Sequence, residues 1–413
     1  MEQGDQHRRR RDWSLLPPDL TALILTTLEL PELLNAAAVC RAWRAAYKAD
    51  PRLDAAPLFR APCLVFHAGD DPASQTATLL SLADGGRRVH YRVSLPDPPF
   101  PTRYVMGSSH GWLATADERS DLLLVNPVTR AQVRLPPIGT LTNVTCRVRR
   151  GVLRSYRVHN INFDGFQSFK PDEGRIRFYE KVVWSSNPTS GNCIVMIIHA
   201  PKNIISFARV GDTRWSLLHV DRLTCQDYED FFYNGEDALF YAIRSNSEVH
   251  TINLHGPFPT VKVIFKAMVL PIHDYKYIVR APWADVLQVR WYDDFDIDDD
   301  NDARTTMIAV YKMDFVEQKI VQVKDLRGYA LFLGFNISFF FLPTEDCSVI
   351  KQNRIYHADD LIDYDYTRNI YAPRPRHMVE VNLEDGSVND VWPSPNSWSN
   401  WPPPVWLMPS FSQ

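Results

Sequence analysis

Three short helical segments between residues 16 and 47 constrain this chain most, because each is too short to bury its own apolar face. Pro17 and Pro18 suit positions at or just before a first helical turn, where the N–H that proline lacks would have no partner. The side chains that follow with the spacing of one helical face are Leu20, Leu23, Ile24, Thr27 and Leu28. Isolated helices of this length are marginal in water, so the segment needs a surface to pack against.

Two further helices are expected behind the first. Pro31 restarts the chain, and the side chains predicted to line the next two helices are Leu33, Leu34, Ala37, Ala38, Cys40, Trp43 and Tyr47. A stripe of this kind has two interpretations. It is either a helical cap packed on the rest of the chain or a module that docks on another protein.

The order of residues is more specific than an apolar stripe. Leu16-Pro-Pro-Asp-Leu20 is followed by Leu30-Pro-Glu-Leu-Leu34 and then by Val39-Cys-Arg-Ala-Trp43. This pattern resembles the F-box, the module by which substrate receptors dock on the Skp-type adaptor of a cullin ubiquitin ligase. The resemblance implies an adaptor-facing and internal apolar surface formed by Leu16, Pro17, Leu20, Ile24, Leu28, Leu33, Leu34, Val39, Cys40 and Trp43.

Composition restricts the partners and the compartment. The chain has 413 residues, a net charge of −4 and a pI near 6.3, which predict no strong field for nucleic acid or a membrane. Its six cysteines include no Cys-x-x-Cys pair, so we expect reduced thiols in the cytoplasm and/or the nucleus. The basic run at residues 7–11 is predicted to be part of a disordered leader over residues 1–11, with a nuclear localisation signal as the alternative.

Beyond residue 55 the helical pattern gives way to short apolar runs separated by turn residues. We predict strands or hairpins over residues 122–135, 193–208, 238–252 and 378–391. Turn residues Asp84 and Asn126 lie about 42 residues apart, as do Gly211 and Asn253, and twice that interval separates Asn126 from Gly211. A repeat of this size matches a propeller blade.

The sequence therefore predicts an α+β multidomain chain: a three-helix F-box over residues 12–55, then a mainly-β, kelch-like β-propeller domain over residues 56–413. The blade number stays open, and an irregular multi-sheet β domain is the rival. The body also resembles that of a large group of plant F-box proteins with a C-terminal domain of unknown function. The segments that carry this resemblance are 107–113, 124–130, 135–137, 331–336, 353–356, 381–386 and 401–406.

Tests for catalytic and metal sites give no candidate, so we expect no cofactor and no enzyme activity. The acidic run at residues 293–302 lacks the bidentate glutamate of an EF-hand loop, since Met307 stands at its twelfth position, and is predicted to be a solvated insertion. No phosphate-binding glycine loop or His-Glu-x-x-His is present, and turn or core roles are expected for the adjacent Ser108, Ser109 and His110.

The C-terminal segment carries Trp392, Trp398, Trp401 and Trp406 among prolines. We expect it to pack back onto the body rather than to serve as a polyproline ligand, because exposed indoles promote aggregation.

Three functions remain. The first is a substrate receptor that brings an unknown protein to a cullin ligase. The second is a β-propeller enzyme or small-ligand binder with a helical cap, which would need titratable groups converging on a central channel. The third is an F-box protein that acts outside a ligase.

Overall fold

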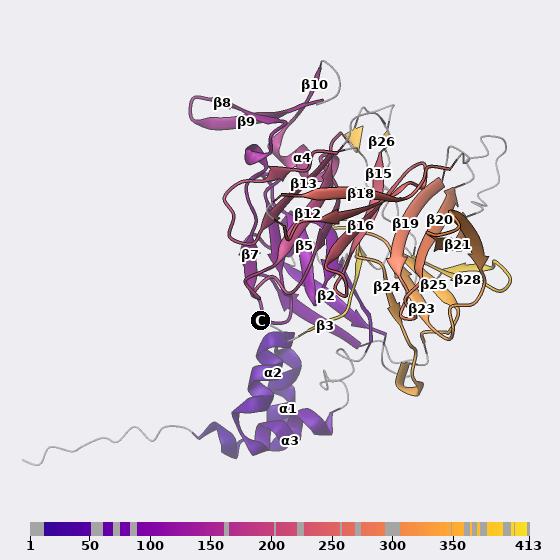
Figure 1. Ribbon diagram of the computed structural model, residues 1–413. Coiled ribbons are helices and arrows are strands. Elements are labelled where there is room, and N and C mark those ends of the chain that lie inside the picture. Colours follow the sequence, from indigo (N-terminus) through magenta and orange to yellow (C-terminus); the bar gives the residue numbers. More distant parts are fainter. Residues whose placement is uncertain are drawn as a thin grey trace, which may run out of the picture.

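The computed structural model describes residues 12–50, 61–68, 75–82, 89–160, 165–201, 204–220, 227–256, 258–268, 274–293, 306–347, 349–358, 364–365, 370–371, 378–390, 398–399 and 401–410. A small group of helices lies at one end of a ring of β-sheets (Figure 1). The predicted fold class, an N-terminal helical module followed by a mainly-β, propeller-like body, is confirmed. Within the described residues no helix has the length and apolar character to cross a membrane.

The helical module has three α-helices after one 3-10 turn. The elements are η1 (Trp13–Leu15), α1 (Pro18–Thr27), α2 (Leu30–Val39) and α3 (Arg41–Ala49). The predicted role of proline is confirmed, because Pro18 and Pro31 both lie in a first helical turn. Asp19 and Glu32 follow them and favour the positive end of the helix dipole.

Six sheets of four or five strands make up the ring within the described residues. The first contains β1 (Cys63–Ala68), β2 (Thr76–Ser81), β3 (Val89–Ser94), β30 (Trp398–Ser399) and β31 (Val405–Leu407). The second contains β4 (Tyr104–Ser109), β5 (Trp112–Ala116), β6 (Leu122–Val125) and β7 (Gln132–Arg134). The third contains β11 (Tyr179–Trp184), β12 (Ile194–His199), β13 (Ile204–Arg209) and β14 (Ser216–Leu217).

The remaining three sheets follow in chain order. The fourth contains β15 (Tyr228–Asn234), β16 (Leu239–Arg244), β17 (Val249–Asn253) and β18 (Thr260–Phe265). The fifth contains β19 (Asp274–Arg280), β20 (Val286–Asp293), β21 (Thr306–Asp314) and β22 (Lys319–Val323). The sixth contains β23 (Ala330–Leu333), β24 (Phe339–Phe341), β25 (Arg354–Ala358), β28 (Met378–Asn382) and β29 (Val388–Asp390). A separate two-stranded ribbon pairs β26 (Tyr364–Asp365) with β27 (Ile370–Tyr371).

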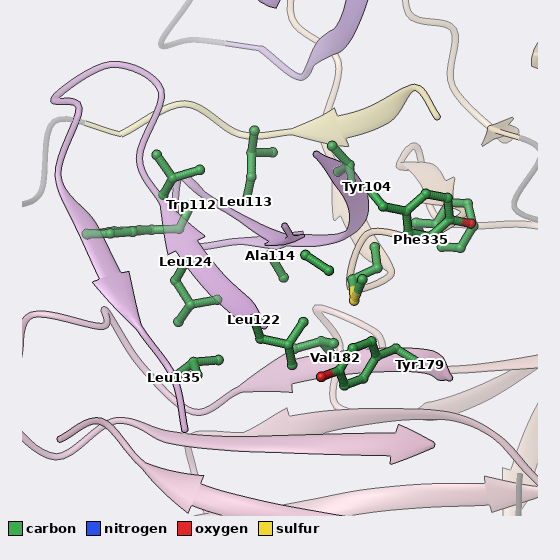
Figure 2. Close-up of a cluster of buried hydrophobic side chains, with 14 of the residues drawn as sticks. Tyr104, Trp112, Leu113, Ala114, Leu122, Leu124, Leu135, Tyr179, Val182 and Phe335 are labelled. Atoms are coloured by element: carbon green, nitrogen blue, oxygen red, sulfur yellow. The ribbon is translucent and has the colours of Figure 1, made fainter. Parts of the chain in front are cut away.

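Apolar cores between neighbouring sheets close the ring. One core joins the first three sheets, and Figure 2 shows part of it around Trp112, Leu124 and Val182. Further cores join the third sheet to the fourth, the fourth to the fifth and the fifth to the sixth. The last core packs Phe332 of the sixth sheet against Leu64 and Trp406 of the first. This closed circle of sheets is the architecture of a β-propeller.

The first sheet combines strands from the beginning and the end of the propeller sequence. Strand β31 pairs antiparallel with β1, so that Cys63 lies opposite Leu407 and Val65 opposite Val405. Trp401 and Trp406 therefore pack back onto the body as predicted: Trp406 is fully buried, and the indole of Trp401 donates to the carbonyl of Pro101 at 2.9 Å. Trp392 and the side chain of Trp398 lie outside the described residues.

The predicted hairpins are confirmed, and the landmarks of the repeat have a common structural position. Asn126 and Gly211 stand in the turn before the outermost strand of their sheet, and Asn253 is the last residue of β17 before that turn, whereas Asp84 lies outside the described residues. The double interval between Asn126 and Gly211 does not contain an additional blade in the described residues. It contains an insertion instead, which consists of β8 (Val144–Arg149), β9 (Val152–His159), β10 (Phe166–Phe169) and α4 (Pro171–Arg177).

Two segments lengthen the repeat after Asn253. Strands β20 and β21 flank the acidic run, whose residues 294–302 lie outside the described part, and Asp293 pairs with Thr306 where the two strands meet it. The sixth sheet departs from a simple meander because β23 and β25 run parallel, with β24 folded back along β23. These departures explain why the spacing of turns fails in the second half of the chain.

A buried ion pair ties the inner strands together. Lys181 Nζ lies 3.0 Å from Asp230 Oδ1, and it donates to the carbonyls of Gly334 and Asn336 at 3.1 and 3.0 Å. Asp230 Oδ2 accepts a hydrogen bond from the backbone N–H of Ile278. Desolvation raises the pKa of the Asp230 carboxyl, and the charge of Lys181 opposes this effect. The pair thus links the third, fourth, fifth and sixth sheets.

A buried histidine predicts a dependence of stability on pH. His199 stacks on Phe178, and its Nε2 lies 2.9 Å from Ser206 Oγ. Burial lowers the pKa of His199 to about 4, whereas the unfolded imidazole has a pKa of about 6.5. Between these values the unfolded chain binds a proton that the folded chain excludes. The free energy of unfolding therefore falls as pH drops through this window, by up to about 3 kcal/mol.

The test compares two histidine variants by thermal unfolding at pH 7 and pH 4.5. His199→Gln is expected to lose less stability on acidification than the wild type. His219→Gln, at an exposed position, is expected to follow the wild type. Equal acid sensitivity of the wild type and His199→Gln would contradict the assignment.

Candidate functional site

The helical module buries a small interior of its own. Leu25, Leu33, Ala37, Ala46 and Tyr47 form this interior, with Leu28, Ala36 and Trp43 packed against it. The indole of Trp43 also donates to the carbonyl of Trp13 at 3.0 Å, which holds η1 against α3. On α1, the side that faces inward is therefore that of Thr21 and Leu25.

The opposite side of α1 is apolar and exposed. Leu20 and Leu23, one turn apart, are 49% and 63% exposed. Trp13 and Leu15 before the helix and Val39 at the end of α2 are exposed as well. Five of the fifteen exposed large apolar side chains of the described residues thus lie within this short module. Such a concentration is typical of a protein-binding surface.

The structure separates the predicted adaptor residues into four groups. Pro17, Leu20 and Val39 are exposed, and Leu16, Ile24, Leu28, Cys40 and Trp43 are half-buried. Leu33 belongs to the interior of the module. Leu34 packs against the core of the propeller, so its contacts are already made within this chain. Trp13, Leu15 and Leu23 are exposed apolar residues outside the predicted set.

Helix α2 fixes the module to the rim of the propeller. Leu30, at the start of this helix, is fully buried in the core that joins the first three sheets. The Glu29 carboxylate accepts from the backbone N–H and the hydroxyl of Ser94 at 2.5 and 2.6 Å. Arg130, in the turn between β6 and β7, donates to Glu29 at 2.8 Å and to both carboxylate oxygens of Glu32. These contacts orient α1 with its exposed leucines directed away from the core.

The attachment predicts that one leucine of the module stabilises the propeller. Leu30→Ala removes a side chain from the propeller core and is expected to lower its free energy of unfolding by about 2–4 kcal/mol. Leu25→Ala, which empties only the module interior, is expected to leave the main calorimetric transition in place. Equal effects of the two substitutions on that transition would contradict the separation of the two cores.

The axis of the propeller offers no comparable site within the described residues. The segment around Phe335 crosses it, because the N–H of Ile337 donates to the carbonyl of Ser108 at 3.1 Å. Phe335 lies beside Tyr104 in Figure 2, with ring centres 6.0 Å apart. A Cβ added to Gly107 would approach the carbonyl oxygen of Val182 to 3.1 Å, which shows how closely the inner strands meet.

Comparison with known families agrees with this geometry. An F-box-like family model matches residues 13–54, and the KIB1-4 beta-propeller model matches residues 79–381. The Arabidopsis thaliana F-box protein SKIP23 is 23% identical over 426 residues, which cover 96% of this chain and 95% of that protein. The F-box/kelch-repeat protein At1g57790 of the same plant is 24% identical over 245 residues, 57% of this chain and 55% of that protein.

The fold and the exposed helical face thus define an F-box protein with a C-terminal β-propeller, the general architecture of a substrate-recognition subunit. More closely, the chain belongs to the KIB1-4 β-propeller family, whose model spans well over half of its length.

Proposed function

We propose that this chain is the substrate receptor of a Skp-cullin-F-box ubiquitin ligase. Residues 12–55 dock on a Skp-type adaptor and through it on a cullin, and residues 56–413 bind the protein to be modified. The observation that carries the proposal is the exposed pair Leu20 and Leu23 on α1, backed by a module whose other side is packed. A partner with an apolar groove would bury both leucines.

The mechanism requires no covalent chemistry from this chain. A receptor raises the effective concentration of its substrate beside a ubiquitin-carrying enzyme held by other subunits. Rigid attachment of α2 through Leu30, Glu29 and Glu32 supports this role, because it fixes the direction of the bound substrate relative to the adaptor. The proposal places the chain in the cytoplasm or the nucleus, where thiols stay reduced.

The packed propeller axis favours the receptor over a propeller enzyme. The buried Lys181 and Asp230 contact each other and backbone groups. Their charges therefore stabilise contacts between sheets and do not bind a substrate.

Reconstitution tests the proposal and separates it from an F-box protein that acts outside a ligase. The full chain is mixed with a Skp-type adaptor and a cullin and analysed by size-exclusion chromatography with light scattering. A ternary complex is the expected result. A complex with the adaptor that excludes the cullin would favour action outside a ligase. Absence of any complex would contradict the docking role.

A further inference from the structure

The β8–β10 sheet, here termed the arm (residues 144–169), projects from the propeller on the side away from α1–α3 (Figure 1). One face of the arm, here termed its back, packs firmly on the propeller. Tyr156, Val158 and Phe169 are buried in the core of the first three sheets. The hydroxyl of Tyr156 also donates to the carbonyl of Arg119 at 2.6 Å. The arm is therefore a fixed extension of the propeller.

The opposite face of the arm, here termed its front, combines arginines with apolar side chains. Residues directly opposite each other on paired strands share a face. Thr145 lies opposite Arg157, Arg147 opposite Ser155 and Arg149 opposite Val152. Since side chains alternate along a strand, Arg147, Arg149 and Arg157 share the front. Phe166 joins them, because it lies opposite His159, two residues beyond Arg157.

The charge of the arm is unbalanced. Five arginines stand between residues 147 and 157, and no acidic residue occurs between Asp121 and Asp164. Within the described residues, no carboxylate lies at ion-pair distance from Arg147 or Arg149. The arm thus creates a local positive electrostatic potential on a chain whose net charge is −4.

Protection of a sheet edge explains only part of this surface. Charges on an edge strand hinder aggregation, which accounts for arginines along β8. It does not account for Val152 and Phe166, which are 52% and 51% exposed on the same face. The guanidinium carbon of Arg157 lies 4.4 Å from the ring centre of Phe166, so this arginine is held in place before any partner arrives. Arginine is one of the residues enriched at binding hot spots.

We propose that the front of the arm binds an extended acidic segment of the substrate protein. This inference rests on the proposed receptor function and names its substrate class. In the described residues β8 pairs with β9 on one side only, so its outer edge is open to an added strand. Carboxylates at every second position of that strand would face Arg147 and Arg149.

The occupant is a peptide rather than a nucleic acid. The open edge of β8 offers main-chain hydrogen-bonding groups with which a peptide strand can pair and a nucleic acid cannot.

Fluorescence anisotropy with two labelled peptides tests the proposal on the full chain. The first peptide alternates Glu and Thr over ten residues, and the second has the same composition with all Glu at one end. The alternating peptide is expected to bind at least about fivefold more tightly. Its affinity should fall about tenfold or more as ionic strength rises from about 0.05 to 0.5 M, because the contacts are exposed ion pairs.

Paired variants test the arginines. Arg147→Gln with Arg149→Gln is expected to weaken binding of the alternating peptide at least about tenfold, whereas Arg147→Lys with Arg149→Lys should retain most of it. The control pair Arg214→Gln with Lys262→Gln removes the same charge from exposed positions of the propeller and should bind as the wild type does.

Three results would overturn the proposal: no binding of the alternating peptide, equal loss in the arm and control pairs, or tighter binding of single-stranded RNA of equal charge. Adaptor binding is measured on the same samples. If the wild type binds the adaptor but not the alternating peptide, only the proposed role of the arm is rejected. Failure of the wild type to bind the adaptor rejects the receptor function, whatever the peptide does.

Discussion

Leu20→Asp combined with Leu23→Asp is expected to weaken binding of the Skp-type adaptor by at least about 100-fold. Both side chains are exposed on α1, so an apolar partner would bury them on docking. Loss of that burial costs about 1.5 kcal/mol or more for each leucine, and about 2.7 kcal/mol corresponds to 100-fold in affinity. Isothermal titration calorimetry with the full chain measures the change.

Two valines on the propeller provide the matched control. Val263 and Val321 are half exposed, as Leu20 is, and lie on β18 and β22. Val263→Asp with Val321→Asp introduces the same charge and is expected to leave adaptor affinity unchanged. Thermal unfolding of the Leu20/Leu23 variant should match the wild type, because neither leucine contributes to the module interior. Adaptor binding of wild-type strength by that variant would contradict the docking face.

Trp406→Ala is expected to lower the free energy of unfolding of the propeller by about 3–5 kcal/mol. The indole is fully buried between the first and sixth sheets, with its ring centre 5.1 Å from that of Phe332. Strand β31 holds it there through pairing with β1, and the hydroxyl of Ser108 donates to the carbonyl of Trp406. Removal of this side chain leaves a cavity where the ring of sheets closes.

Urea unfolding followed by circular dichroism measures this loss. Trp13→Ala provides the control, since its indole is exposed in the helical module and the hydrogen bond from Trp43 goes to its backbone carbonyl, which the substitution keeps. That control should change the free energy of unfolding by less than about 0.5 kcal/mol. Similar effects of the two tryptophan substitutions would show that β31 does not close the propeller.

The sequence predicted the helices and hairpins because their signals are local. Proline positions placed the starts of α1 and α2, and turn residues such as Asn126 placed the hairpins. The spacing on α1 also predicted the leucine stripe, although it did not say which side faces inward. The structure assigns that side to Thr21 and Leu25, because Leu25 belongs to the module interior and Leu20 does not.

Contacts between distant parts of the chain lay beyond the sequence patterns. Leu30 could not be assigned to the propeller core, and Glu29 could not be paired with Arg130, because 101 residues separate them. The parallel pairing of β23 with β25 also breaks the repeat that turn spacing relies on. The arm could not be predicted from the sequence for a different reason. Its positive charge is cancelled by acidic residues elsewhere in the net charge of the chain. In addition, cross-strand register is needed to place Arg147 and Arg157 on one face.

Hydrogen exchange of the full chain with and without a Skp-type adaptor tests the central claim most directly. The account predicts that the adaptor slows exchange of backbone amides in η1 and α1, residues 13–27, and leaves the strands of the propeller unchanged. Protection confined to the propeller, or no protection in residues 13–27 at saturating adaptor, would contradict it.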